Sequence, residues 1–163
     1  MRAGILIVAM TVGLAAPVDT AAAEDKEPTA IVAIGGAGEW GLPGAASFGP
    51  SVSVEFTPIR NWLEIEIGTA TMFRRGVTEF ETDLLFKKPF TLSDTVEVMV
   101  GAGPSWSYTR QDGIKWGATV ALDVMVWPWP ERKFGWFVEP SYTVNQDSEK
   151  SLAVSVGLLI AIP

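Results

Sequence analysis

The strongest constraint on this chain is an alternation of apolar and polar residues with a period of two, which runs from about residue 30 to the C-terminus. Val52, Val54 and Phe56, for example, alternate with Ser53 and Glu55. Successive side chains of an extended chain point to opposite faces, so this period is typical of β-strands. No helical period is visible after residue 30. The alternation predicts eight strands, at residues 30–38, 51–58, 63–73, 78–86, 96–108, 114–126, 134–144 and 151–162.

The stretches between these segments are short and carry turn residues such as Asn61, Gly76 and Gly113. Eight strands joined by short connections can close on themselves, which removes the exposed sheet edges. We therefore expect an all-β domain, an eight-stranded antiparallel up-and-down barrel. Because proline donates no ladder hydrogen bond, three proline-containing triplets are expected to mark strand starts or bulges. They are Gly49-Pro50-Ser51, Gly103-Pro104-Ser105 and Glu139-Pro140-Ser141.

The two faces of the predicted strands differ in side-chain size and in charge. One face is rich in Gly, Ala, Ser and Thr with acids between them, whereas the other face of the segments after residue 50 carries large apolar residues and no charge. Small side chains suit a confined lumen, and an eight-stranded interior has little room for so many large ones. At a rise of about 3.3 Å and a tilt near 40°, ten residues cover roughly 25 Å, the height of an outer-membrane apolar band. The apolar face is thus predicted to face lipid, as in a barrel of the transmembrane type.

The first residues have the order of a secretory signal peptide. Arg2 is followed by an uncharged apolar run over residues 4–16 and by the small-residue triplet Ala21-Ala22-Ala23. A run of about 13 residues is shorter than the roughly 20 that a membrane helix needs, so export and cleavage are the better interpretation. We expect a signal peptide at residues 1–23, a short acidic segment at 24–29 and the barrel domain at 30–163.

Composition excludes several kinds of chemistry. The chain contains no Cys and no His, which excludes disulfides, Cys-based metal sites and Ser-His-Asp or Cys-His catalysis. A net charge of −7 argues against nucleic acid as a partner, because phosphate binding relies on a surplus of Lys and Arg. We therefore expect no enzyme activity, no catalytic residue and no cofactor.

In its export segment and its eight alternating segments, the chain resembles the small outer-membrane β-barrel proteins of Gram-negative bacteria, the OmpA-like or OmpX-like eight-stranded class. The resemblance covers about residues 30–163. It implies location in the cell outer membrane, with outer-membrane lipid, lipopolysaccharide and, during insertion, the barrel assembly machinery as partners of a monomer. The enzymes known on this fold rely on a catalytic His, so none of their residues is carried over. The resemblance implies periplasmic turns at 58–61, 89–94 and 127–133, and outer connections near 39–47, 74–76, 110–113 and 145–150.

Acidic residues dominate the charges on the polar face. Clustered carboxylates are what hard cations prefer, which raises the hypothesis of a cation path or of a Ca²⁺ or Mg²⁺ site. The simpler interpretation, which we favour, is a plug of ion pairs that fills a narrow lumen, so that no metal site is assigned. The residues of this expected lumen polar network are Glu55, Glu64, Glu66, Glu79, Glu81, Asp83, Glu97, Lys115, Asp123, Lys133 and Glu139.

Aromatic residues gather near the ends of the predicted strands. Amphipathic rings prefer the level of the lipid headgroups, so this placement predicts interfacial girdles. The expected girdle residues are Trp106, Tyr108, Trp116, Trp127, Trp129 and Trp136.

The pattern as a whole favours a non-enzymatic outer-membrane barrel with a structural or envelope-integrity role. Two alternative functions are compatible with the same alternation of apolar and polar residues. A soluble periplasmic lipocalin-like barrel would turn the apolar face inward around an apolar ligand. A narrow cation-selective pore would keep the same orientation and conduct ions past the acids.

Overall fold

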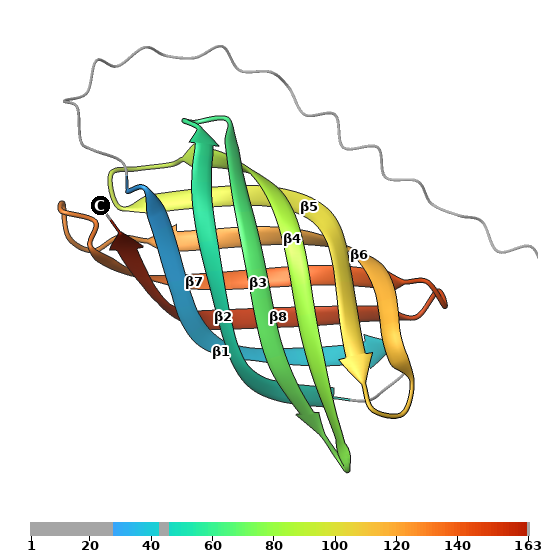
Figure 1. The fold of residues 1–163 in the computed structure, drawn as a ribbon. Coiled ribbons are helices and arrows are strands. Elements are labelled where there is room, and N and C mark those ends of the chain that lie inside the picture. Colours follow the sequence, from blue (N-terminus) through green and yellow to red (C-terminus); the bar gives the residue numbers. More distant parts are fainter. Residues whose placement is uncertain (1–27, 43–45, 163) are drawn as a thin grey trace, which may run out of the picture.

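The computed structural model describes residues 28–42 and 46–162, which form one closed barrel of eight antiparallel strands (Figure 1). The expected signal peptide at 1–23 and most of the acidic segment at 24–29 lie outside the described residues. Among the residues that are described, no helix could cross a membrane. The strands are β1 (Ala30–Leu42), β2 (Ala46–Ile59), β3 (Leu63–Arg74), β4 (Val77–Thr91), β5 (Val96–Thr109), β6 (Gly113–Val126), β7 (Phe134–Asn145) and β8 (Lys150–Ile162).

Each strand pairs with its sequence neighbours, and the pairing of β1 with β8 closes the barrel from Ala30↔Ile162 to Leu42↔Lys150. The start of β1 and the C-terminal end of β8 therefore lie at one end of the barrel, which we call the terminal end. The turns after β2, β4 and β6 lie there as well, and the turns after β3, β5 and β7 lie at the opposite, far end (Figure 1).

Two connections that the sequence predicted are in fact strand. Glu39 pairs with Ser47 and Trp40 with Ala46, so β1 and β2 extend through most of the connection expected near 39–47. Similarly, β4 continues to Thr91, beyond the start of the turn expected at 89–94. The reason is that backbone pairing extends a strand whether or not its side chains alternate, and the alternation is weak in both places.

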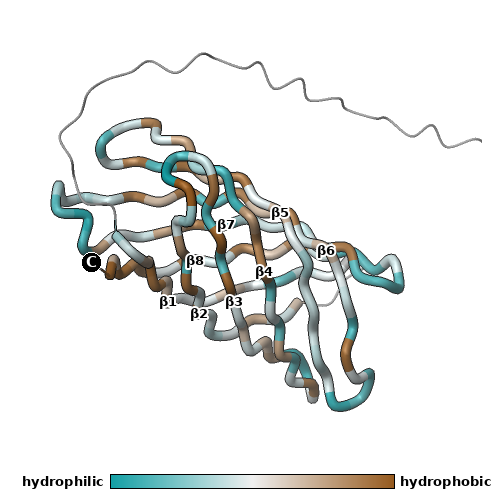
Figure 2. Tube along the Cα trace, turned by 45° about the horizontal axis from the view of Figure 1, so that its top comes forward, coloured by the Kyte–Doolittle hydropathy of each residue, from teal (hydrophilic) through white to brown (hydrophobic). Residues whose placement is uncertain are grey.

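The barrel is apolar outside and polar inside. Large apolar side chains from all eight strands are exposed on the outer surface, including Val120, Ile67 and Leu158. Glu55, Lys87 and other charged residues are buried in the lumen. Figure 2 shows hydrophobic stretches along the strands and hydrophilic turns at the barrel ends. This orientation contradicts the lipocalin-like alternative, which required an apolar cavity inside.

An apolar plug fills the lumen towards the terminal end. Its members come from the inward-facing positions of five strands and from the residue that follows β6. Met99 and Leu159 have no exposed surface, and Trp127 is 2% exposed. The plug consists of Ile31, Ala33, Met99, Met125, Trp127, Phe137 and Leu159.

The place of Trp127 corrects the expectation that it belongs to an aromatic girdle. It lies inside the barrel because it continues the inward positions of Asp123 and Met125 just beyond the end of β6. Alternation, which assigns a side chain to one face, thus outweighs the preference of Trp for the end of a strand.

Candidate functional site

The centre of the lumen holds a buried lysine surrounded by four carboxylates, and we call these five residues the Lys87 cluster. Lys87 Nζ lies 3.1 Å from Glu55 Oε1, 2.7 Å from Glu66 Oε2, 3.3 Å from Asp123 Oδ2 and 2.5 Å from Glu139 Oε2. The Lys87 side chain has no exposed surface, and the most exposed of the four acids, Glu139, reaches only 14%.

Five different strands each supply one member of the cluster. Lys87 comes from β4, and the acids come from β2, β3, β6 and β7. Glu55 and Glu66 lie directly opposite each other, which brings two carboxylates to the same height. On the other side of β4, Gly101 pairs with Lys87, and a Cβ at this glycine would approach the lysine Cγ to 2.5 Å. The glycine therefore leaves the room that the lysine stem needs.

The acids of the cluster outnumber its base. An ammonium group has three N–H donors, so Lys87 cannot give each of the four carboxylates a full hydrogen bond. Within the described part of the chain, the buried oxygens Glu55 Oε2 and Asp123 Oδ1 have no hydrogen-bond partner. Buried charges need a close opposite charge, so the four buried carboxylates depend on the Lys87 ammonium group for their stabilisation.

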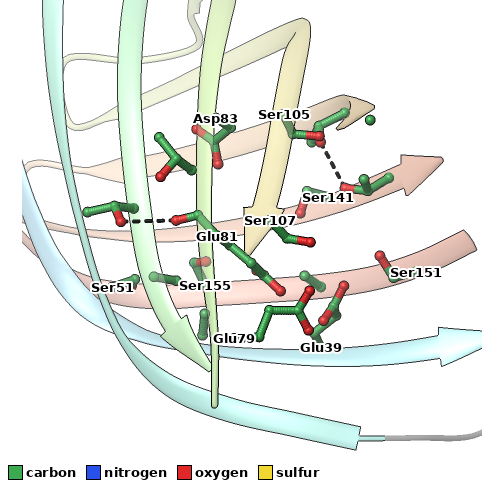
Figure 3. Close-up of a pocket in the computed structure, with 18 of the residues that line it drawn as sticks. Glu39, Ser51, Glu79, Glu81, Asp83, Ser105, Ser107, Ser141, Ser151 and Ser155 are labelled. Carbon is green, nitrogen blue, oxygen red and sulfur yellow. Dashed lines mark hydrogen bonds between the residues drawn. The ribbon is translucent and has the colours of Figure 1, made fainter. Parts of the chain in front are cut away.

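Between the cluster and the far end lies an open cavity of about 310 Å³, which we call the acidic cup. Serine and threonine are the most frequent residues in its wall, which also carries Glu39, Glu79, Glu81 and Asp83. The three glutamates converge there (Figure 3), each with a carboxylate oxygen within 4.8 Å of those of the other two. Ser47 donates a hydrogen bond to Glu39. The small wall residues are what keeps this half of the lumen open.

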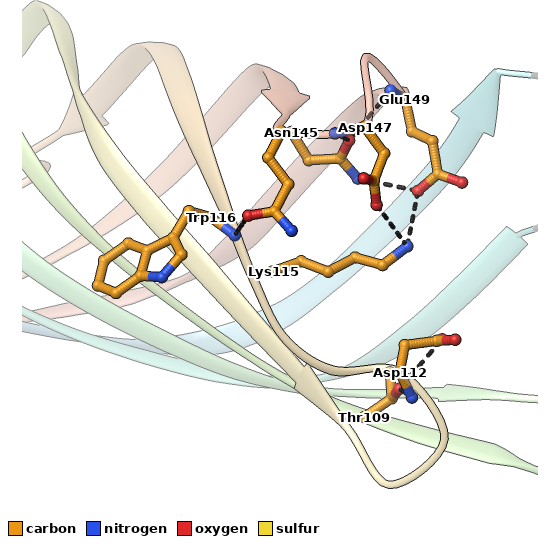
Figure 4. Close-up of polar contacts among 8 residues, drawn as sticks. Thr109, Asp112, Lys115, Trp116, Asn145, Asp147 and Glu149 are labelled. Carbon is orange, nitrogen blue, oxygen red and sulfur yellow. Dashed lines mark hydrogen bonds and ion pairs between the residues drawn. The ribbon is translucent and has the colours of Figure 1, made fainter.

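Charged residues also meet at the mouth of the cup (Figure 4). Lys115 Nζ lies 3.3 Å from Asp147 Oδ2 and 3.1 Å from Glu149 Oε2, and Asn145 donates a hydrogen bond to the same Glu149 oxygen. The hydrogen bond from Asn145, followed by the one from Lys115, lowers the pKa of Glu149 below its usual value. Both acids are well exposed, so these ion pairs contribute little to stability.

The structure brings some of the expected lumen residues together and separates others. Glu64 is buried on the inward face of β3, whereas Glu97 meets Arg132 at 3.5 Å near the terminal end. Lys115 lies at the mouth, and Lys133 is exposed in the turn before β7. The expected lumen residues that lie in the Lys87 cluster or line the acidic cup are Glu55, Glu66, Glu79, Glu81, Asp83, Lys115, Asp123 and Glu139.

Sequence reasoning missed the residue at the centre. Lys87 follows Asp83 and Leu85 at the period of two, so its inward position was readable, but the predicted strand ended at residue 86 and Lys87 was left out of the expected polar network. Glu39 was missed as well, because it fell in an expected connection.

Four of the expected girdle residues have exposed rings near strand ends. They are Tyr108, Trp116, Trp129 and Trp136, and Trp106 is half-buried with its ring centroid 5.6 Å from that of Trp116. Trp40 and Trp62, which were not expected in a girdle, are also exposed near strand ends.

A closed barrel of eight antiparallel strands, apolar outside and charged inside, defines the fold of the eight-stranded outer-membrane β-barrel proteins. Solved structures of that class are similar to this chain. Neisserial surface protein A has a TM-score of 0.67 and 14% identity, over 82% of this chain and 97% of its own. Ail of Yersinia pestis has a TM-score of 0.58 and 13% identity, over 82% and 98%. The N-terminal barrel of Pseudomonas aeruginosa OprF has a TM-score of 0.58 and 14% identity, over 83% and 100%.

No protein-family model matches the chain, and no curated protein matches it either. At identities of 13–14% the similar structures show the fold alone.

Proposed function

We propose that this protein is a non-enzymatic, monomeric component of the cell outer membrane with a structural or envelope-integrity role. The observation that carries the proposal is a lumen closed twice, by the Lys87 cluster at its centre and by the apolar plug towards the terminal end. A barrel closed in this way is suited to hold its shape in a membrane rather than to pass solutes.

The outer surface supports a lipid environment. Among the outward-facing positions of the eight strands, the only charged residues are Lys88 and Lys150, and both lie near strand ends. An uncharged and largely apolar band between charged and aromatic ends is what the hydrocarbon region of a membrane requires of a barrel.

Charges at the far end support lipopolysaccharide as the lipid partner. Arg75 and Arg110 are exposed in the first position after β3 and β5, and in the described part of the chain neither makes an ion pair. They follow the exposed aromatic residues Phe73 and Tyr108 by two residues. Arginine pairs well with phosphate, so these two side chains are suited to the phosphate groups of an outer-leaflet glycolipid.

Fractionation of cells that express the full-length chain tests the location. We expect the mature protein in the outer membrane, with migration on a gel that changes on heating, as for a folded barrel. Recovery in the soluble periplasmic fraction without detergent would contradict the proposal.

Conductance in planar bilayers tests the closed lumen. We expect no stepwise ion current from the wild-type barrel, because the plug and the cluster leave no open water path at the terminal end. Regular cation-selective steps would instead favour the narrow-pore alternative. The control is the same recording on Glu149→Gln. This variant removes one negative charge at the mouth and leaves the plug and the Lys87 cluster unchanged.

A further inference from the structure

The Lys87 cluster carries more negative charge than its lysine can balance. Four carboxylates face one ammonium group, and two of their buried oxygens, Glu55 Oε2 and Asp123 Oδ1, have no hydrogen-bond partner within the described residues. Both residues are only 2% exposed. A buried carboxylate oxygen without a donor or a cation is costly, so each of these two oxygens requires a partner, which is either a cation or a proton.

The geometry of the same residues suits a metal ion. Glu55, Glu66 and Asp123 each have a carboxylate oxygen within 4.8 Å of those of the other two. Three oxygens at such separations can coordinate one central cation at the usual metal–oxygen distances of about 2.0–2.6 Å. The donor set contains only carboxylate oxygens, which selects hard cations such as Mg²⁺ and Ca²⁺.

The acidic cup provides a route from the far end to this position. Glu66 and Glu139, two members of the cluster, also line the cup, so the cluster lies at its floor. The wall above carries the acids Glu39, Glu79 and Glu81. Seven acids and three bases line the cup, the bases being Arg74, Lys115 and Lys150, so its net charge is negative. A net negative cavity raises the local concentration of cations, which favours entry of one.

We propose that Glu55, Glu66 and Asp123 form a site for one divalent cation of the Mg²⁺ or Ca²⁺ class, next to Lys87 at the floor of the acidic cup. The ion neutralises the carboxylate charge that Lys87 leaves unbalanced, and water from the cup completes its coordination. The site adds cation binding to the proposed structural role and does not depend on the membrane in which the barrel resides.

The test measures the metal content of the full barrel, folded in detergent micelles and dialysed against CaCl₂ or MgCl₂ in separate samples. We expect a single tightly held ion per chain and a heat-unfolding midpoint that rises with the concentration of the ion. The double variant E55Q/D123N, which keeps Glu66 and Glu139 as partners of Lys87, should lose the ion. The control Glu81→Gln removes an acid from the wall of the cup and should keep it.

Two results would overturn the proposal. A wild-type barrel that holds no ion would mean that protons neutralise the cluster. An ion retained by E55Q/D123N and lost in Glu81→Gln would place the site in the cup among Glu39, Glu79 and Glu81.

A second variant keeps the test valid if E55Q/D123N does not fold. Lys87→Gln removes the competing ammonium group and leaves all four carboxylates. We expect this variant to bind the ion more tightly than wild type and to gain more stability from it than wild type does. Unchanged or weaker binding by a folded Lys87→Gln barrel would contradict a site shared with the lysine. Ion content and bilayer conductance are separate readouts, so failure of this site leaves the test of the proposed function intact.

Discussion

Two adjacent lysines differ completely in their surroundings. Lys87 is buried among four carboxylates, whereas Lys88 points outward and donates a hydrogen bond to the Asn61 carbonyl oxygen at the surface. In the absence of divalent cations, Lys87→Met should lower the free energy of unfolding by about 3–5 kcal/mol, because it leaves buried carboxylates uncompensated. Lys88→Met should change it by only about 0.5 kcal/mol. Urea unfolding in micelles measures both free-energy changes. Equal changes in the two variants would show that the Lys87 cluster does not stabilise the barrel.

Two tryptophans that are close in the sequence, Trp127 and Trp129, also differ in their surroundings. Trp127 is buried in the plug, and Trp129 is 57% exposed. Trp127→Ala should lower the free energy of unfolding by about 3–5 kcal/mol through the cavity it leaves. Trp129→Ala loses only surface contacts and should have the smaller effect. If Trp129→Ala proves as costly as Trp127→Ala in the same urea titration, the plug does not stabilise the barrel.

At the scale of strands, the three proline triplets lie inside strands rather than at starts or bulges. Around Pro104, β4 and β5 pair at Asp83↔Ser105 and again at Phe86↔Ala102, with the ladder interrupted but the register unchanged. Proline lacks the N–H that would bond the neighbouring strand, so the ladder opens locally.

Gly103, the residue before Pro104, is a position where only a residue without a Cβ fits. A Cβ at Gly103 would overlap the carbonyl oxygen of Leu84, whereas a Cβ at Gly36 would meet nothing closer than 3.6 Å. Gly103→Ala should therefore cost about 1–3 kcal/mol, and Gly36→Ala should be neutral or slightly stabilising. Heat-unfolding midpoints of the two variants measure this difference. A Gly103→Ala barrel as stable as Gly36→Ala would refute the close approach.

The turn between β7 and β8 should respond to acid. The pKa of Glu149 is lowered in the folded chain by Asn145 and Lys115, from an ordinary value of 4.5. The contacts of the carboxylate therefore stabilise the turn above pH 4.5 and are lost as the pH falls through the lowered value. An NMR titration of Glu149 should give a midpoint below 4.5, and Asn145→Ala should move it upward. A wild-type midpoint at or above 4.5 would contradict these contacts.

At the scale of the whole molecule, the stability lost by placing a charge on the outer surface should depend on the depth of that position in the membrane. Val120 lies near the middle of β6 and Ile114 near its start, and both are exposed. In a bilayer, Val120→Arg should cost about 2–4 kcal/mol and Ile114→Arg about 0–1 kcal/mol, because the cost of a charge falls towards the interface. Unfolding of both variants from lipid vesicles measures the difference. Equal costs would argue against a lipid band centred on Val120.

Much of this architecture was readable from alternation. Residues such as Val120 and Asp123 were assigned to opposite faces correctly, and the absence of charge on one face indicated which side meets lipid. The ends of strands were less predictable. Trp40 and Pro89 lie in strands because neighbouring strands offer backbone partners, and a sequence does not show those partners.

The sequence by itself determined the number of strands, the barrel and the distribution of small and large side chains, because all of these follow from local periodicity and composition. Only the tertiary structure decided that Lys87 gathers acids from four other strands and that Trp127 closes the lumen. The physical reason is that a contact across the lumen depends on the stagger of strands around the closed barrel. That stagger is a property of all eight strand pairings together, and no single segment encodes it.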